Sequence, residues 1–202
     1  RHAPGLRVPR RRDGGAVSVS PQGRWEDVFL VTRAADFAAR RHAAQHRKGS
    51  TREPYVNHLA EVASLLAETA REPDAALVAA GWLHDTLEDT PTDREELERQ
   101  VGPAVAALVA EVADDKSLPT PARKRRQVET APRKSAGARA IKVADKTSNL
   151  RSLAASPPEG WERQRIADYV AWAEEVVAGC RGTNAALENL FDRAAAEVRG
   201  TL

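Results

Sequence analysis

The sequence predicts an all-α fold, a compact multi-helix bundle that forms a single domain. From Trp25 onward, apolar residues recur with the i, i+3, i+4 spacing of amphipathic helices nearly throughout the chain. No segment carries a convincing strand pattern, because the alternation at residues 16–20 is too short to build on. The length of 202 residues fits one large domain better than two very small ones, and we place that domain at residues 24–199.

Residues 1–23 differ from the rest in composition. They hold five arginines in the first twelve positions, no aromatic residue and no apolar core of a secretory signal. We interpret residues 1–23 as a disordered basic arm, with a targeting or RNA-binding arm as the alternative.

The remaining helices follow from periodicity and capping signals. The spacing predicts a helix that includes residues 31–42, then a loop at 48–54. Asn57 is the expected N-cap of the second helix. Asp74 is the expected N-cap of a third helix that runs to about Glu88 and is apolar nearly all round, which indicates a central, buried position.

The second half of the chain continues in the same way. Thr92 and Glu95 form a capping box for a short fourth helix, and a fifth spans about 103–112. Residues 114–136 are polar and basic, and we expect a mobile helix–loop segment there.

Two long helices and a final one complete the bundle. A sixth helix at about 138–154 is broken by the prolines at 157–158. A seventh ends at Gly182, and Thr183 is the expected cap of the last helix.

Composition excludes several classes of protein. The 31 Lys and Arg residues against 29 Asp and Glu give a net charge of +2, which is no general reason to expect a nucleic-acid partner. No stretch reaches the roughly 18 apolar residues of a membrane span. The single cysteine, Cys180, excludes an intrachain disulfide and a cysteine-based zinc site, so we expect a cytoplasmic protein.

One cluster of acidic residues lies at the end of the apolar third helix. His84 and Asp85 are followed by Glu88 and Asp89, so three carboxylates share one helical face and repel one another. A divalent cation would relieve this repulsion, whereas the alternative is a solvated acidic helix end. The other histidines outside the second helix are one in the arm and two that we expect to face solvent: His2, His42 and His46.

Two further residues are candidates only in combination with this cluster. Asp145 is the single carboxylate on an otherwise apolar helical face, where a salt bridge to Lys142 or Lys146 is the simpler interpretation. His58 lies one residue inside the second helix and, taken alone, is an ordinary helix-start histidine.

Together, these residues predict a metal site. Two imidazoles (His58, His84) and two carboxylates (Asp85, Asp145) come from three successive long helices. Such a mixed N/O set suits Mn, Fe or Zn better than Ca, and the lack of thiolates argues against a structural zinc. Four protein ligands on a six-coordinate ion leave room for water and a substrate oxygen, as in a metal-assisted hydrolase.

The order of these residues resembles the H…HD…D pattern of HD-superfamily phosphohydrolases. Neighbouring motifs resemble the hydrolase domain of RelA–SpoT homologues and the stand-alone small alarmone hydrolases, from about Val31 to Phe191. The motifs are Arg47-Lys48, Pro54-Tyr55-Val56-Asn57-His58, the run from Leu83 to Thr90, Asp114-Asp115-Lys116, and Lys142-Val143-Ala144-Asp145-Lys146 with Asn149-Leu150-Arg151.

The resemblance implies a function. It implies removal of pyrophosphate from the 3′ position of guanosine tetra- or pentaphosphate, with one Mn²⁺ per chain. Glu88 and Asp89 would position or deprotonate the attacking water. The implied metal ligands are His58, His84, Asp85 and Asp145.

The resemblance also implies substrate contacts. Arg47 and Lys48 match a nucleotide-contacting pair, Asn149 a ribose-side residue, and Tyr169 a tyrosine of the small hydrolases. At Ser148 the family generally carries an aromatic residue or histidine, so this serine would loosen base packing. The basic run Arg123-Lys124-Arg125-Arg126 is either a solvated face or a screen for polyphosphate charge.

Three alternatives remain open at this point. One is an HD phosphohydrolase for another phosphorylated nucleotide, such as an adenosine analogue or the 2′-phosphate of NADPH. A second is a non-catalytic alarmone-binding module. The third is nucleic-acid binding through the arm and residues 123–126, which predicts steep salt dependence. The sequence does not define an oligomeric state.

Overall fold

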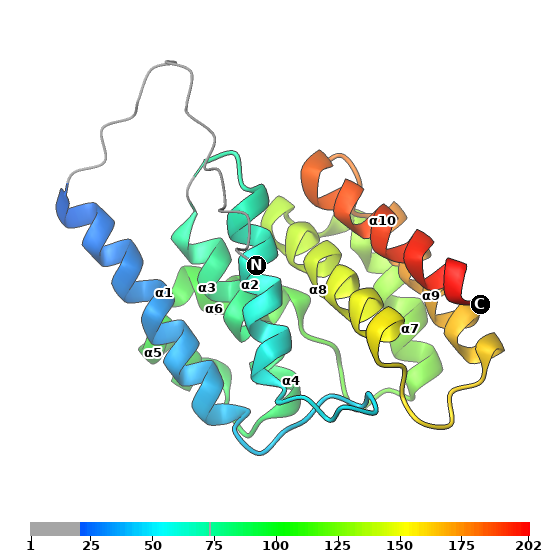
Figure 1. The fold of residues 1–202 in the computed structure, drawn as a ribbon. Helices are drawn as coiled ribbons and strands as arrows, with labels where there is room; N and C mark the ends of the chain where they lie inside the picture. Colours follow the sequence, from blue (N-terminus) through cyan, green and yellow to red (C-terminus); the bar gives the residue numbers. More distant parts are fainter. Residues whose placement is uncertain (1–20, 73) are drawn as a thin grey trace, which may run out of the picture.

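The structure is a computed structural model that describes residues 21–72 and 74–202, and the regular elements in this part of the chain are helices joined by loops (Figure 1). The all-α prediction is confirmed: within these ranges the extended pairings are isolated bridges between residues 46 and 54 and between 49 and 158. The helices are α1 (Pro21–Arg41), α2 (Val56–Thr69), α3 (Ala75–Leu83), α4 (Thr86–Asp89), α5 (Arg94–Val101), α6 (Pro103–Val112), α7 (Thr120–Thr130), the 3₁₀ turn η1 (Ala131–Arg133), α8 (Ala136–Ala155), α9 (Arg163–Ala178) and α10 (Ala185–Thr201).

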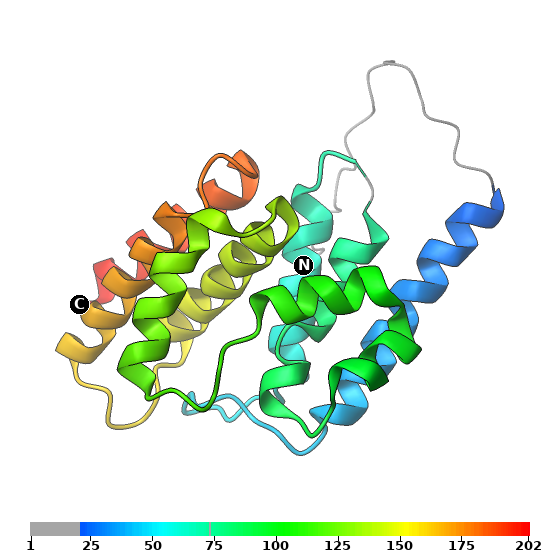
Figure 2. The ribbon, with the colours of Figure 1, turned by 180° about the vertical axis from the view of Figure 1, so that it is seen from behind.

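Helix α8 lies at the centre of the bundle. It packs against α2, α3, α6, α9 and α10, while α1 and α10 lie at opposite edges (Figure 1). From behind, α7 lies beside α9 (Figure 2). The side chains of Ile141 and Leu150 on α8 are fully buried. Because α8 contacts both halves of the bundle, polar residues on it can meet partners from several elements.

Helix α3 is buried, as its apolar sequence predicts, but it is shorter than expected. Asp74 caps it by accepting a 2.9 Å hydrogen bond from the amide of Leu77. The helix ends at Leu83, and a break at residues 84–85 separates it from α4. A Cβ atom on Gly81 would lie 2.6 Å from Cδ1 of Leu66, so the glycine permits the close approach of α2 and α3.

Two predicted caps are displaced by one residue. Asp93, not Thr92, caps α5 by accepting a 2.7 Å hydrogen bond from the amide of Glu96. Asn184, not Thr183, caps α10 through its side chain. In both places two capping residue types stand side by side, and only the backbone conformation decides which of them has the N-cap position.

Two predictions near the start of α2 are wrong. Asn57 is inside the helix, whose N-cap is Tyr55 with no side-chain cap. His42 is buried rather than exposed, since its ring stacks on Tyr55 at 5.4 Å between centroids and its Nδ1 lies 2.7 Å from Oε1 of Gln45. His46 is exposed, as expected.

Two segments with unusual composition complete the fold. The polar segment 114–136 is largely ordered into α7 and η1, and the indole N–H of Trp172 donates to the carbonyl of Lys124. Helix α1 begins at Pro21, so residues 21–23 of the predicted arm are helical, and the rest of the arm lies outside the described residues. Within the described ranges, no helix is both long and apolar enough to span a membrane.

Candidate metal centre

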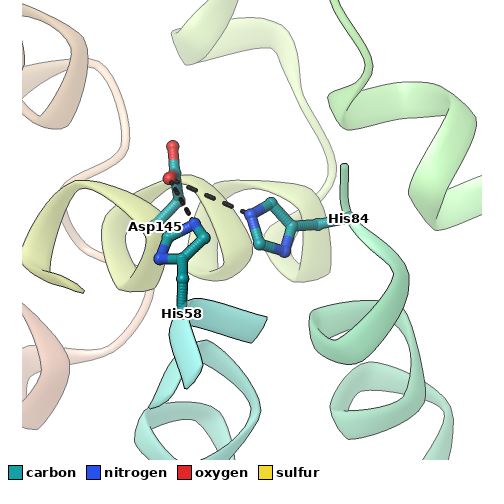
Figure 3. A group of neighbouring side chains, drawn as sticks. All are labelled: His58, His84 and Asp145. Carbon is teal, nitrogen blue, oxygen red and sulfur yellow. Dashed lines mark ion pairs between the residues drawn. The ribbon is translucent and has the colours of Figure 1, made fainter. Parts of the chain in front are cut away.

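Three side chains from distant parts of the sequence converge on one buried point. His58 comes from the first turn of α2, His84 follows the last residue of α3, and Asp145 lies midway along α8 (Figure 3). Their ligand atoms all lie within 4.8 Å of one another. Nε2 of His58 is 3.5 Å and Nε2 of His84 is 3.9 Å from Oδ1 of Asp145. The predicted convergence of these three residues is confirmed.

Asp85, the fourth predicted ligand, lies at the edge of this group. Its Oδ2 is 3.1 Å from Nε2 of His84 and 3.7 Å from Nε2 of His58. The same oxygen accepts a 2.6 Å hydrogen bond from the hydroxyl of Tyr55. Asp85 therefore faces the same space as the other three residues but is also held by a tyrosine.

The donor set fits a divalent cation. Nδ1 of His84 lies 2.8 Å from the carbonyl of Gly81, which can only accept, so Nδ1 keeps its proton and Nε2 is the nitrogen that can give up a proton and bind a metal. Although Asp85 is close, Nε2 of His84 is buried without a well-directed hydrogen bond within the described part of the chain. A buried nitrogen of this kind, beside carboxylate oxygens and without thiolates, suits Mn, Fe or Zn.

The electrostatics of the group also favour a cation. Burial lowers the pKa of His84, but the charge of Asp85 outweighs it and raises that pKa to about 9. Burial raises the pKa of Asp145, but Lys146 and the two imidazoles hold it well below its usual range. Two anionic carboxylates thus attract positive charge to a nearly dry site, which a divalent cation supplies in place of a proton.

The sequence left two roles open for Asp145, a salt bridge to a lysine or a metal ligand, and its two carboxylate oxygens are placed for one role each. Its Oδ2 pairs with Nζ of Lys146 at 2.9 Å, whereas its Oδ1 faces the histidines. Lys142 instead points to Asp114, 3.8 Å away. The salt bridge therefore neutralises one oxygen of the carboxylate and leaves the other for a ligand.

Glu88 and Asp89 lie beside the group but have different surroundings. Oε1 of Glu88 accepts a 2.6 Å hydrogen bond from the amide of Asp114, and burial, followed by the charge of Asp85, raises the pKa of Glu88 to about 7. Asp89 forms an ion pair with Lys116 and is more exposed. The two carboxylates therefore do not share one environment, and the raised pKa of Glu88 suits exchange of a proton near neutral pH.

A cavity of about 310 Å³ is connected to the metal group through two residues of its wall, since Tyr55 and Asn149 donate hydrogen bonds to Asp85 and Asp145. It is lined by basic, polar and aromatic side chains, and Asp89 lies in its wall. All four residues that the resemblance implies for substrate line it: Arg47, Lys48, Asn149 and Tyr169. The structure thus brings them together on one side of the metal group.

Sequence reasoning did not assign Trp161 to this site. Trp161 lines the cavity with its ring centroid 6.0 Å from that of Tyr169. The ammonium of Lys124, from the basic run 123–126, lies 4.6 Å from the ring centroid of Trp172, and that of Lys146 lies 4.4 Å from it. The tryptophans gave no local signal, because their approach to the site depends on how α9 packs against α7 and α8.

Ser148 does not lie where a residue that packs against the base of the nucleotide would have to lie. Its side chain is fully buried and does not line the cavity. Its Oγ lies 2.8 Å from Nδ1 of His58, on the side of the ring opposite to the metal group. The serine therefore contacts a metal ligand rather than leaving a gap against a base.

The helical fold with a His, His-Asp, Asp centre defines an HD-type protein. A family model described as "HD domain" matches residues 34–171, and the chain belongs to this family. The chain is 50% identical over 162 residues to guanosine-3′,5′-bis(diphosphate) 3′-pyrophosphohydrolase MESH1 of Homo sapiens, which covers 80% of this chain and 90% of the relative. The Drosophila melanogaster protein of the same name is 45% identical over 156 residues, 77% of this chain and 87% of the relative.

A solved structure agrees with these relatives. It is that of a metazoan ortholog of SpoT that hydrolyzes ppGpp and plays a role in starvation responses. Its TM-score is 0.80 at 42% identity, and the match covers 86% of this chain and 97% of the solved one.

Proposed function

We propose that this protein is a divalent-metal-dependent hydrolase that removes the 3′-pyrophosphate of guanosine 3′,5′-bis(diphosphate). The products would be GDP, or GTP from the pentaphosphate, and pyrophosphate. The observation that carries the proposal is the group of His58, His84 and Asp145 beside a cavity with basic and aromatic walls. Two residues of the cavity wall, Tyr55 and Asn149, donate hydrogen bonds to Asp85 and Asp145. Relatives of nearly the same length whose names state this activity support the choice of substrate.

The metal would be held by His58, His84 and Asp145, with Asp85 as the fourth ligand, and we propose Mn²⁺, one ion per chain. When bound, the ion supplies Lewis-acid stabilisation of charge on the phosphoryl oxygens. Tyr55 donates to Asp85 and keeps one oxygen of that carboxylate in a fixed direction. Lys146 does the same for the outer oxygen of Asp145.

Glu88 is the residue that we propose to accept the proton of the attacking water. Its raised pKa, about 7, suits a group that takes up and releases a proton near neutral pH. Asp89 would orient the water or the substrate from the cavity wall, where Lys116 holds its carboxylate. The proton taken by Glu88 leaves again when the 3′-oxygen is released from phosphorus and protonated.

The cavity would bind the nucleotide. Arg47 would stack on or pair with the nucleotide through its planar guanidinium, and Lys48 would offer a point charge to phosphate. Tyr169 and Trp161 would form an aromatic wall for the nucleoside, whereas Asn149 would face the ribose. The ammonium of Lys124 lies above Tyr169, at 5.6 Å from its ring centroid, close enough to draw a polyphosphate toward this wall.

Another phosphorylated nucleotide, such as an adenosine analogue or NADPH, is the main competing substrate. The experiment is a substrate panel with purified protein and Mn²⁺, together with elemental analysis and turnover before and after chelation. Pyrophosphate release from the guanosine compound should be the fastest reaction and should vanish on chelation. A faster reaction with another nucleotide would overturn the choice of substrate, and tight binding without turnover would indicate a non-catalytic binding module.

A further inference from the structure

A chain of hydrogen bonds leads from the outer face of the bundle to one histidine of the metal group. Arg151 donates to Oε1 of Glu61 at 2.9 Å. Oε2 of Glu61 accepts a 2.6 Å hydrogen bond from Oγ of Ser148, and that Oγ lies 2.8 Å from Nδ1 of His58. Glu61 and His58 lie three residues apart on α2, while Ser148 and Arg151 lie three apart on α8. The chain therefore crosses the α2–α8 interface three times.

The direction of these hydrogen bonds is fixed by the glutamate. A carboxylate only accepts, so the single hydroxyl proton of Ser148 points to Glu61. The serine oxygen then presents a lone pair to His58, and Nδ1 of the histidine must donate to it. Nε2 of His58 is left without a proton, and this is the nitrogen that faces Asp145 at 3.5 Å.

The imidazole of His84 is oriented by a different contact. Its Nδ1 is held by the main-chain carbonyl of Gly81 at 2.8 Å, which no side-chain substitution elsewhere removes. His58 depends instead on two side chains, because Ser148 alone could either donate or accept. Only the presence of Glu61 makes the serine an acceptor toward His58.

We propose that Glu61 is a positioning residue of the metal centre, which acts through Ser148 to hold His58 with Nε2 free for the cation. This inference rests on the metal centre of the proposed function but not on the identity of the nucleotide. Partners of this kind behind metal-binding histidines typically change metal affinity by about 10–100-fold when they are removed.

The test compares Glu61→Ala and Ser148→Ala with a control serine–glutamate pair that lies within α2. Ser64 donates to Glu68 at 2.8 Å on the exposed face of α2, so Ser64→Ala and Glu68→Ala are the controls. Binding of Mn²⁺ alone is measured by the EPR signal of the free ion. Both relay variants should bind Mn²⁺ about 10–100-fold more weakly, whereas the controls should match the wild type.

A second readout reports the histidine directly. The side-chain ¹⁵N shifts of metal-free protein, assigned by the signal that a His58→Gln chain loses, should show one tautomer with the proton on Nδ1. In Glu61→Ala and Ser148→Ala this signal should become that of a mixture, while the His84 signal should stay unchanged. A variant that merely loosened the fold would not change the signal of His58 while leaving that of His84 unchanged. Saturating Mn²⁺ should also restore turnover in Glu61→Ala.

The outcomes separate this inference from the proposed function. Unchanged Mn²⁺ affinity and an unchanged His58 tautomer in both relay variants would overturn the positioning role. Wild-type protein that binds Mn²⁺ but does not hydrolyse the guanosine compound would overturn the proposed function and leave the relay intact. If the wild type bound no Mn²⁺, the assignment of the cation would fail for both.

Discussion

The side-chain amide of Asn149 donates a 2.6 Å hydrogen bond to Oδ1 of Asp145, the carboxylate oxygen that faces both histidines. The carbonyl oxygen of the same amide accepts from Arg47 at 3.1 Å. One asparagine thus joins the basic wall of the cavity to the metal group. We predict that movement of Arg47 toward a bound nucleotide would release this amide and so change the hydrogen bonding that directs Asp145.

Asn149→Ala should therefore affect metal and substrate together. We expect kcat/KM to fall by about 10–100-fold, with a weaker affinity for Mn²⁺, because Asp145 loses the donor that directs its oxygen. Steady-state kinetics and Mn²⁺ titration measure the two effects. Gln164→Ala, which removes an exposed amide that pairs with Asp168 on α9, is the control. Wild-type values of both parameters in Asn149→Ala would refute the connection.

Hydrolysis should depend on the ionisation of Glu88. Burial and the charge of Asp85 raise the pKa of Glu88 to about 7, and only the ionised carboxylate accepts a proton. Activity should therefore rise with pH, with a midpoint at or below about 7, because a nearby cation favours the ionised form. Profiles of kcat against pH at saturating Mn²⁺ should show this limb.

Glu88→Gln tests the origin of that limb. Its kcat should fall by about 10²–10⁴-fold and lose the limb, whereas Asp115→Asn, an exposed change in the adjoining loop, should retain both. A Glu88→Gln chain with wild-type turnover would show that another group accepts the proton.

Removal of the metal should destabilise the fold. Mn²⁺ at a hundred times its dissociation constant should raise the free energy of unfolding by about 2.7 kcal/mol relative to chelated protein. Thermal unfolding with and without EDTA measures the difference. His84→Ala should abolish the increase, and His46→Ala, at an exposed histidine, should keep it. An equal increase in His84→Ala would place the ion elsewhere.

Lys146→Met should lower the free energy of unfolding, because it leaves the buried carboxylate of Asp145 without its cationic partner. Lys146 is almost fully buried and pairs with Asp145 at 2.9 Å, so its loss should lower the free energy of unfolding by about 3–5 kcal/mol in chelated protein. Saturating Mn²⁺ should reduce this loss, since the cation compensates the same charge. Urea unfolding measures both states.

Lys116→Met provides the comparison for this stability change. Its ion pair with Asp89 is largely exposed, and its loss should cost about 0–1 kcal/mol. An equal cost for the two lysines would mean that burial of the Asp145 pair contributes nothing to stability.

Much of the fold could be predicted because helical periodicity is a local property. Helix α6 was predicted to end at about Val112, where it does end, and the cap at Asp74 follows from residue type alone. The caps at Asp93 and Asn184 were missed by one residue, since neighbouring residues had equal capping chemistry and the backbone chose between them. The burial of His42 was missed because it depends on a ring contact with Tyr55 across a loop.

The site could be predicted only in part. His58, His84 and Asp145 share a residue pattern, and the pattern was sufficient to predict their convergence. The sequence suggested that Ser148 would loosen packing against the base of the nucleotide, whereas its side chain contacts His58. The contact of Ser148 with Glu61 joins residues 87 positions apart, and no local pattern reports such a distance.

Gly81 contributes both to the packing of the core and to the orientation of a histidine of the metal group. Its missing Cβ allows Leu66 of α2 to approach, and its carbonyl holds the imidazole of His84. The spacing of α2 and α3 and the orientation of His84 therefore depend on the same residue and cannot change independently during evolution. A side chain at position 81 would force α2 and α3 apart and would thereby displace the carbonyl that orients His84, so one substitution would disturb both the core and the ligand.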